Sequence, residues 1–313
     1  ALIRPTIEEI SDVLGGDWRK SVLFLKGMQL NEANALCGGP AFANALMADE
    51  RLIHDPFVQE RIHGMLQKRL DEAKLGAIRV HGNFSIVSGD PYALCQSLFQ
   101  LPVTGLLRAG ESYNRYWNDQ QVERVACFRA PMTCHNNIRI LRMRDTPQLR
   151  EWYRYLTTVT VFNAWDTAAH ALNGLDKDSD SCLLTDNPIL VENTREEPAI
   201  LCVQRQAEKK AVTQEDLIQS NINSFGDEIG AITNRITSMF EAQARFVPGS
   251  EEYQTLDYRI KCGQLFQQNA IDKAKGILAK PMPKAWYSPA ALRIQETDSP
   301  GQANAKRAQQ RLL

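Results

Sequence analysis

Three aspartates stand at alternate positions of this 313-residue chain: Asp176, Asp178 and Asp180. Of all stretches in the sequence, this one is the clearest candidate for a chemical role. Carboxylates that are held close together repel one another and lose hydration, so an ordered cluster of them calls for a positive charge between them. In an extended or turning backbone, side chains at positions i, i+2 and i+4 point the same way and can converge on one point. A hard divalent cation suits that point, and Mg²⁺ takes oxygen ligands octahedrally at about 2.0–2.1 Å. The three aspartates are therefore candidate metal ligands.

The same spacing is compatible with other structures. An acidic turn between two apolar segments is common and is often only solvated. A calcium-binding EF-hand loop places Gly at its sixth position and Glu at its twelfth. Counting from Asp176, those positions hold Ser181 and Asn187, which excludes the calcium loop. The spacing alone leaves both the metal site and the solvated turn open.

The composition narrows the classes of protein. With 43% hydrophobic and 23% charged residues, the chain can build a substantial core and one or two domains. The net charge of −1 gives no global basic field for nucleic acid, although local basic patches are still allowed. The seven cysteines contain no CxxC pair, which indicates reduced, intracellular thiols and a cytoplasmic location.

No apolar run approaches the ~20 residues of a membrane span and no signal peptide is visible, so we expect no membrane partner. The chain begins at Ala1, which suggests processing or a piece of a longer protein.

The hydrophobic pattern predicts helices at both ends of the chain and short strands in the middle. An amphipathic helix is expected from Asp55 to Lys74, and two long helices over 226–246 and 253–277. Many short strands with tight turns favour a small barrel. The stretches that look like strands are 21–25, 78–87, 122–129, 156–162, 189–191 and 199–203.

Two polar positions on turns need an interpretation of their own. Asp90 lies in Gly-Asp-Pro ahead of a short helix, where capping the helix explains it better than a functional role. Arg129 follows a strand-like run and precedes Pro131, with His135 shortly after. This is a polar cluster on a rigid loop, and such a cluster taken alone is more often an ordinary loop than a site.

Four separated motifs resemble one superfamily, and they occur in the same order. Arg129-Ala130-Pro131 with His135 resembles the Arg-Ala-Pro-Thr-Leu-His segment of the large catalytic subunit of cellular RNA polymerases. Asp176-Lys177-Asp178-Ser179-Asp180 resembles the Asp-x-Asp-Gly-Asp of those enzymes and of the RNA-silencing RNA-dependent RNA polymerases. The segments 229–234 and 269–276 resemble two further motifs of the silencing enzymes, Leu-Gly-x-Ile-x-Asn and Ala-Val-Asp-Phe-Pro-Lys-Thr-Gly. The resemblance covers about residues 78–283 and extends to the single-chain two-barrel polymerases of phages and prophages.

The resemblance implies an α+β fold with a double-psi β-barrel catalytic core and flanking helices. In this family two such barrels face each other across a cleft. We expect five segments: an N-terminal helical support region, the tail of a first barrel, a second double-psi barrel with the triple-Asp loop, a helical region and a disordered tail. Their boundaries are 1–76, 77–123, 124–205, 206–285 and 286–313.

The resemblance also implies a reaction. A template-dependent RNA polymerase adds nucleoside triphosphates to an RNA 3′ end, and an RNA template is favoured here over DNA. Asp176, Asp178 and Asp180 would be the catalytic residues and hold a Mg²⁺ that activates the primer hydroxyl, while a second Mg²⁺ arrives with the triphosphate. Arg129 and, more weakly, Asn173 would contact the ribose of the incoming nucleotide.

Two lysines are candidates for contacts with nucleic acid. Lys273 and Lys275 could bind phosphates of the template or the nascent RNA. A solvated helix face explains them equally well, and the sequence leaves both interpretations open.

The sequence departs from the family at several places, including the spacing from Arg129 to His135 and from Asn173 to Asp176. The family's glycine is Ser179 here, and a serine at positive φ costs about 1–2 kcal/mol. The catalytic lysines of the first barrel are not recognisable, so that barrel would belong to a longer protein or a partner chain. The alternative function is therefore a catalytically inactive nucleic-acid-binding or virion protein that retains the barrel.

Overall fold

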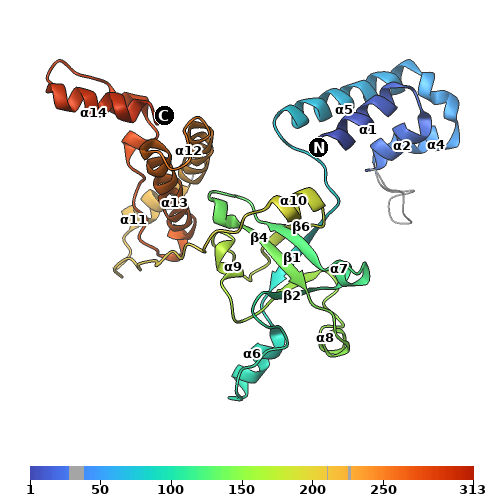
Figure 1. Cartoon of the computed structure of the whole chain (residues 1–313), viewed down its shortest axis with the longest axis horizontal. Coiled ribbons are helices and arrows are strands. Elements are labelled where there is room, and N and C mark those ends of the chain that lie inside the picture. The colour runs from blue at the N-terminus through green and yellow to red at the C-terminus, as the bar shows by residue number, and fades with distance from the viewer. Residues whose placement is uncertain (28–38, 210, 225–226) are drawn as a thin grey trace. The chain divides into compact units, whose positions relative to one another are not determined.

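In the computed structural model, the chain forms two compact units, residues 1–81 and 82–313, each with its own hydrophobic core (Figure 1). The structure describes residues 1–27, 39–209, 211–224 and 227–313. Among these residues, no helix combines the length and the apolar character needed to cross a membrane.

All regular secondary structure among the described residues of the first unit is helical. Its core is apolar and includes Phe24, Leu46 and Ile62. The predicted helix from Asp55 is confirmed: the Asp55 carboxylate caps the helix by accepting from the backbone N–H groups of residues 57 and 58. The helices are α1 (Arg4–Leu14), α2 (Trp18–Lys26), α4 (Ala41–Ala48), η1 (Glu50–His54) and α5 (Pro56–Lys74).

The strand predicted over 21–25 is wrong, because this stretch lies inside helix α2. The Asp17 carboxylate accepts from the backbone N–H groups of Arg19 and Lys20 and so begins the helix. Gly27 ends it with a left-handed φ of 95°. A short apolar run cannot be assigned to strand or helix by its periodicity, and here the capping residues decide.

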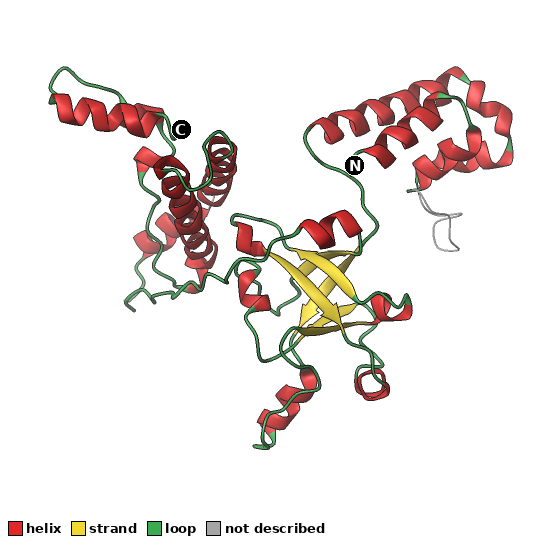
Figure 2. Ribbon diagram, in the orientation of Figure 1, coloured by secondary structure: helices red, strands yellow, loops and turns green. Residues whose placement is uncertain are grey.

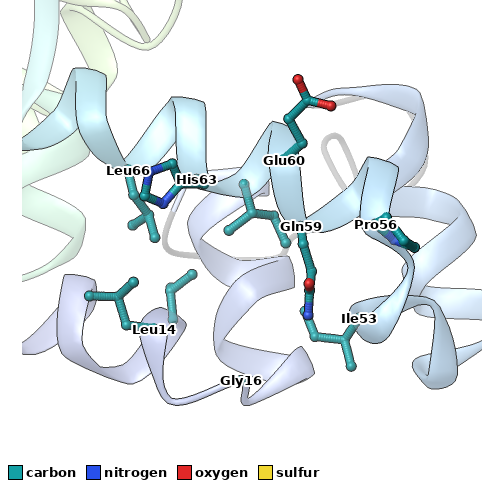
Figure 3. A pocket seen from close by; sticks show the side chains of 10 residues that line it. Leu14, Gly16, Ile53, Pro56, Gln59, Glu60, His63 and Leu66 are labelled. Carbon is teal, nitrogen blue, oxygen red and sulfur yellow. The ribbon is translucent and has the colours of Figure 1, made fainter.

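A pocket of about 480 Å³ lies in the first unit between the end of α1, η1 and α5 (Figure 3). Leu14, Ile53 and Leu66 contribute apolar side chains to its wall, and Gln59 and His63 contribute polar ones. None of the residues predicted to perform chemistry lines it.

The centre of the second unit is a closed six-stranded barrel, shown in yellow in Figure 2. Its strands follow the order β1-β5-β2-β4-β3-β6 around the barrel. The pairs β1–β5 and β2–β4 are parallel, and the other neighbours are antiparallel. The predicted α+β class with a double-psi barrel core and flanking helices is confirmed. The strands are β1 (Asn83–Ser88), β2 (Glu111–Asn114), β3 (Arg124–Phe128), β4 (Ile138–Met143), β5 (Val159–Phe162) and β6 (Ser181–Thr185).

The predicted division between two barrels at residue 123 is wrong. Strands β1 and β2 come from the segment expected to be the tail of a first barrel, yet they belong to the same barrel as β3–β6. The register shows why: Ile86 of β1 pairs with Val159 of β5, and Tyr113 of β2 pairs with Val161 of that strand. Strand β5 thus joins β1 and β2 through hydrogen bonds between residues far apart in sequence.

The barrel interior combines an apolar core with a small polar network. Trp117, Phe162 and Leu184 are fully buried there. Asn114 donates to Thr160 Oγ1 at 2.9 Å, and this hydroxyl donates to Ser85 at 2.8 Å. These three polar side chains on β2, β5 and β1 satisfy one another, as buried polar groups must.

Short helices connect the strands, and the expected capping role of Asp90 is confirmed. Its carboxylate accepts from the backbone N–H groups of Tyr92 and Ala93, and also from the hydroxyl of Tyr153. The connecting helices are α6 (Pro91–Leu98), α7 (Arg115–Asp119), η2 (His135–Asn137), α8 (Pro147–Trp152), α9 (Ala168–Ala171) and α10 (Pro188–Asn193).

A helical region follows the barrel. Helices α12 and α13 approach closely at Gly263, where a Cβ would lie 2.8 Å from the side chain of Ile236. Their shared core also contains Cys134, which comes from the loop after β3. The elements are α11 (Gln214–Ser224), α12 (Glu228–Gln243), α13 (Glu251–Ile271), η3 (Asp272–Lys275), η4 (Lys284–Trp286), η5 (Pro289–Leu292) and α14 (Pro300–Gln310).

Three further predictions in the second unit are wrong. Residues 189–191 belong to helix α10, because Pro188 suits the first helical position and the Asn187 side chain caps the helix. Residues 199–203 form no strand. The tail predicted to be disordered contains helix α14, where Ser299 and Gln302 form a reciprocal capping box.

Candidate functional site

The acidic turn lies directly before strand β6, where the barrel closes. Asp176 and Asp178 are exposed, whereas the side chain of Asp180 is only 25% exposed. The backbone carbonyl of Asp180 accepts from Val87 N–H at 2.8 Å, which anchors the end of the turn on strand β1. The C-terminal end of the turn is therefore fixed by a backbone hydrogen bond to strand β1 of the barrel.

Arg129 and Asp180, two of the predicted site residues, form an ion pair. Arg129 follows strand β3, and its Nη2 donates to Asp180 Oδ2 at 2.7 Å. Its Nη1 donates to the backbone carbonyl of Asn173 at 2.5 Å. The Arg129 side chain is 14% exposed, so both contacts are largely shielded from water. The guanidinium of Arg129 thus binds both Asn173, just before the acidic turn, and Asp180, at its end. Its planar set of N–H donors suits this role.

Asn173 is almost completely buried and has a φ of 44°, a left-handed conformation that asparagine tolerates. Its Nδ2 donates to the carbonyl of Pro131 and to Oε1 of Gln267, both at 2.8 Å. The side chain therefore fixes the loop with its two N–H groups, and its Oδ1 is buried without a hydrogen-bond partner among the described residues.

Asp176 contacts a lysine from the helical region. Lys275 Nζ donates to Asp176 Oδ2 at 2.6 Å and lies 3.0 Å from Asp272 Oδ1. The hydrogen bonds to Asp176 and then Asp272 raise the pKa of Lys275 above its ordinary value, so the ammonium stays protonated. Lys273, the other predicted nucleic-acid ligand, pairs instead with Glu228 at 3.6 Å.

The three carboxylates do not converge as a ready-made metal site. No group of three His, Cys, Asp or Glu side chains within the described ranges is placed to hold a metal ion. The contacts explain this: Asp180 faces Arg129 and the backbone N–H of Asp176, Asp176 faces Lys275, and Asp178 has no partner among the described residues. The donor set still fits a hard cation, because two of the three carboxylates already hold a positive group.

Ser179 adopts a φ of 101°, the left-handed side of the backbone map. This is the position where the family carries glycine. A residue with a Cβ is strained there by about 1–2 kcal/mol. The turn therefore needs the conformation that glycine provides, and serine adopts it at a cost.

Side-chain contacts link the four sequence motifs, either directly or through Asn173 and Gln267. Gln267 of α13 accepts from Asn173 and donates to Thr233 Oγ1 of α12 at 2.5 Å. Thr233 belongs to the third motif, and Lys275 links the fourth motif to Asp176. His135 of the first motif packs its ring edge-on against Phe240 of α12, with centroids 4.8 Å apart.

The sequence predictions missed Gln267. In the structure the side chains of Gln267 and Gln264 are both fully buried on the same face of α13. A run of glutamines in an amphipathic helix is easily taken for its solvated face. Only the partner atoms of Gln267 show that this residue belongs to the site.

The family of the chain follows from its sequence. A family model described as RNA dependent RNA polymerase matches residues 37–288, which is most of the chain. The chain belongs to the RNA-dependent RNA polymerase family, and the family predicted from the four ordered motifs is confirmed.

One solved structure that it resembles is the RNA dependent RNA polymerase QDE-1 from Thielavia terrestris, with a TM-score of 0.49 and 17% sequence identity. The match covers 87% of this chain and 30% of that chain, so this chain spans less than a third of the polymerase's length. Comparison with curated proteins finds no match.

Proposed function

We propose that this chain supplies the metal-binding barrel of an RNA-directed RNA polymerase, a nucleotidyltransferase that adds nucleoside triphosphates to an RNA 3′ end. The observation that carries the proposal is the pair of contacts made by the guanidinium of Arg129. It donates hydrogen bonds to the carboxylate of Asp180 and to the backbone carbonyl of Asn173. It brings together two motifs 51 residues apart in a chain of this family.

The catalytic residues in this proposal are Asp176, Asp178 and Asp180. They would hold a divalent cation, Mg²⁺ by the chemistry of their oxygen donors. When bound, such a cation lowers the pKa of the attacking hydroxyl and stabilises charge on the transferred phosphoryl group. Asp180 would stay oriented by Arg129, while Asp178 is free of protein contacts in the described chain and can turn toward the cation.

Arg129 and Asn173 would bind the ribose of the incoming nucleotide. The Asn173 Oδ1 atom is a buried acceptor without a hydrogen-bond partner among the described residues, so a sugar hydroxyl would reach it only after the surrounding loop opens. Arg129 would act mainly by fixing the loop, because its two terminal nitrogens already donate to Asp180 and Asn173. This division of roles makes Asn173 the side chain that selects the sugar.

The other partners are a nucleic-acid template, the nascent RNA and nucleoside triphosphates. Lys273 and Lys275 are half exposed and would reach phosphates once released from their present carboxylate partners. The first-barrel lysines of this family would come from another part of a longer protein or from a partner chain. An RNA template is the primary expectation, and DNA is the second arm of the test.

The test is primer extension by the full-length protein with labelled nucleotides, Mg²⁺, and single-stranded RNA and DNA templates in parallel. Asp178→Asn is the informative variant, because this side chain has no partner among the described residues whose loss would disturb the fold. Glu192→Gln, an exposed carboxylate on α10, is the matched control. Template-dependent product that is lost only in Asp178→Asn supports the proposal, and product from that variant overturns it.

A second function is favoured by two observations. The strained φ of Ser179 and the dispersed carboxylates fit a barrel that binds nucleic acid without catalysis, such as a virion protein. This alternative predicts RNA binding that weakens with salt and no incorporation of nucleotide. Incorporation by the wild-type protein excludes it.

A further inference from the structure

Lys275 is placed as a counter-ion of the acidic turn. Its ammonium donates to Asp176 Oδ2 at 2.6 Å and lies 3.0 Å from Asp272 Oδ1, so two carboxylates share one positive charge. It lies at the end of η3, where Gly276 turns the chain with a left-handed φ of 81°. The contact spans 99 residues of sequence and joins the fourth motif to the second.

The two carboxylates around Lys275 differ in exposure and in their other partners. The Asp272 side chain is only 13% exposed, and its Oδ2 accepts from Gln204 at 2.5 Å. Asp176 is 49% exposed, and its only side-chain partner in the described chain is Lys275. Asp272 is therefore a fixed anchor for the ammonium, and Asp176 is the partner that can be exchanged.

Positively charged side chains near the acidic turn form ion pairs with two of its three carboxylates. Arg129 binds Asp180 and Lys275 binds Asp176. Lys177, inside the turn, lies instead over Gly89 at the end of β1, where a Cβ would be 2.7 Å from its Nζ. Asp178 alone is free of ion pairs within the described ranges, which leaves the turn short of a third positive contact.

We propose that Lys275 is a resident counter-ion which a divalent cation must displace from Asp176 when it binds the acidic turn. The proposal rests on the proposed function, because it takes Asp176 to be a ligand of that cation. A cation and an ammonium cannot both take the same Oδ2 at bonding distance, since the two positive charges repel. Metal binding and the position of Lys275 are therefore coupled.

The displacement leaves Lys275 beside the site. Asp272 still holds the ammonium after Asp176 turns to the metal, so the charge stays next to the turn. There it can meet a phosphate of the nucleic acid or the triphosphate. Lys275 then neutralises Asp176 before the metal binds and contacts a phosphate after the metal has bound.

Lys273 offers a matched control. It lies on the same η3 segment and is 53% exposed, close to the 57% of Lys275. Its partner is Glu228 of α12 rather than a residue of the acidic turn. Removing either charge changes the net charge equally, but only Lys275→Met removes a contact with a residue of the acidic turn.

The experiment measures Mg²⁺ and Mn²⁺ binding to the full-length protein by calorimetry and by electron paramagnetic resonance. Because half-exposed ion pairs are weak, we expect Lys275→Met to tighten binding by about three- to fivefold. We expect Lys273→Met to change it by less than about twofold, because its partner Glu228 lies outside the acidic turn. Unchanged or weaker binding by Lys275→Met overturns the proposal.

A second readout follows the lysine itself. Lysines that carry ¹³C-methyl groups remain charged and give separate NMR signals, and the signal absent in Lys275→Met identifies this residue. We expect that signal to shift during a Mg²⁺ titration with the midpoint found by calorimetry. Mg²⁺ binding without a shift overturns the proposal but leaves the polymerase assignment standing. No cation binding by any variant overturns the metal site and this inference together.

Discussion

The side-chain amide of Asn173 donates to Oε1 of Gln267 at 2.8 Å, and this contact joins the loop before the acidic turn to helix α13. Gln267 passes the contact on to Thr233 of α12. Both amide side chains are buried, so their hydrogen bonds cannot be replaced by water without a rearrangement. The position of Asn173, and with it the carbonyl that receives Arg129, therefore depends on two helices outside the barrel.

Gln267→Leu should lower the free energy of unfolding by about 1–3 kcal/mol, because it leaves a buried N–H of Asn173 without an acceptor. Urea denaturation followed by circular dichroism measures the change. Gln268→Leu is the control, since the side chain of this neighbour makes no hydrogen bond with described residues and the change should alter stability by less than about 0.5 kcal/mol. Equal stability of the two variants would show that the Asn173 contact contributes nothing.

Ser179→Gly should stabilise the protein by about 0.5–1 kcal/mol. Glycine relieves the strain at a φ of 101°, and the greater flexibility of the unfolded chain cancels part of that gain. Thermal and chemical unfolding of both proteins measure the difference. Ser179→Ala keeps the Cβ and should bring no gain. A less stable glycine variant would mean that the serine hydroxyl has a role of its own.

Asp180→Ala and Asp178→Ala should separate structure from chemistry. Asp180→Ala removes the acceptor for Arg129 and for the N–H of Asp176, so unfolding should become easier by about 1.5–3 kcal/mol. Asp178→Ala removes no contact with described residues and should leave stability within about 0.5 kcal/mol of wild type. Both should abolish nucleotide incorporation under the proposed function. A strongly destabilised Asp178→Ala would reveal a structural role for this carboxylate.

Tyr153 should make the protein less stable at alkaline pH. Burial first, and then the hydrogen bond to Asp90, raise the pKa of Tyr153 in the folded state. The raised pKa contributes stability that is fully present below the unfolded tyrosine pKa of about 10. Above that pH the unfolded chain loses the proton while the folded chain keeps it, so stability falls by up to about 1.4 kcal/mol per pH unit.

The check is to measure unfolding of wild type and Tyr153→Phe from pH 8 to pH 11. The variant should be about 0.5–1.5 kcal/mol less stable at pH 8, because it loses the bond to Asp90. The difference should shrink above about pH 10. Other residues that titrate in this range, including buried Tyr113, are common to both proteins and cancel. A constant difference across the range would refute the assignment.

The motifs could be predicted from the sequence because each combines unusual residue types at a fixed spacing. Arg129 and the acidic turn were predicted as parts of one site, and the ion pair with Asp180 now joins them. The barrel class followed from the short strands and turns. Strand β3 was predicted at 122–129, close to its observed bounds.

Other features depend on contacts that no local pattern encodes. Strand β6 is only five residues long and follows the acidic turn directly, so it has no periodicity of its own. Strands β1 and β2 were assigned to another barrel because their partner β5 lies far along the chain. The pairing of Lys275 with Asp176 spans 99 residues, and no local pattern around either residue predicts it.

Cys134 lies in the hydrophobic core that α12 and α13 build, although it belongs to the loop between strands β3 and β4. A shortened protein that stops at residue 205, the boundary expected from sequence, would expose this side chain and leave Asn173 without Gln267. The barrel and the helices therefore form one folding unit around the loop that carries Arg129. Any attempt to transplant the acidic turn into another protein must carry both helices with it.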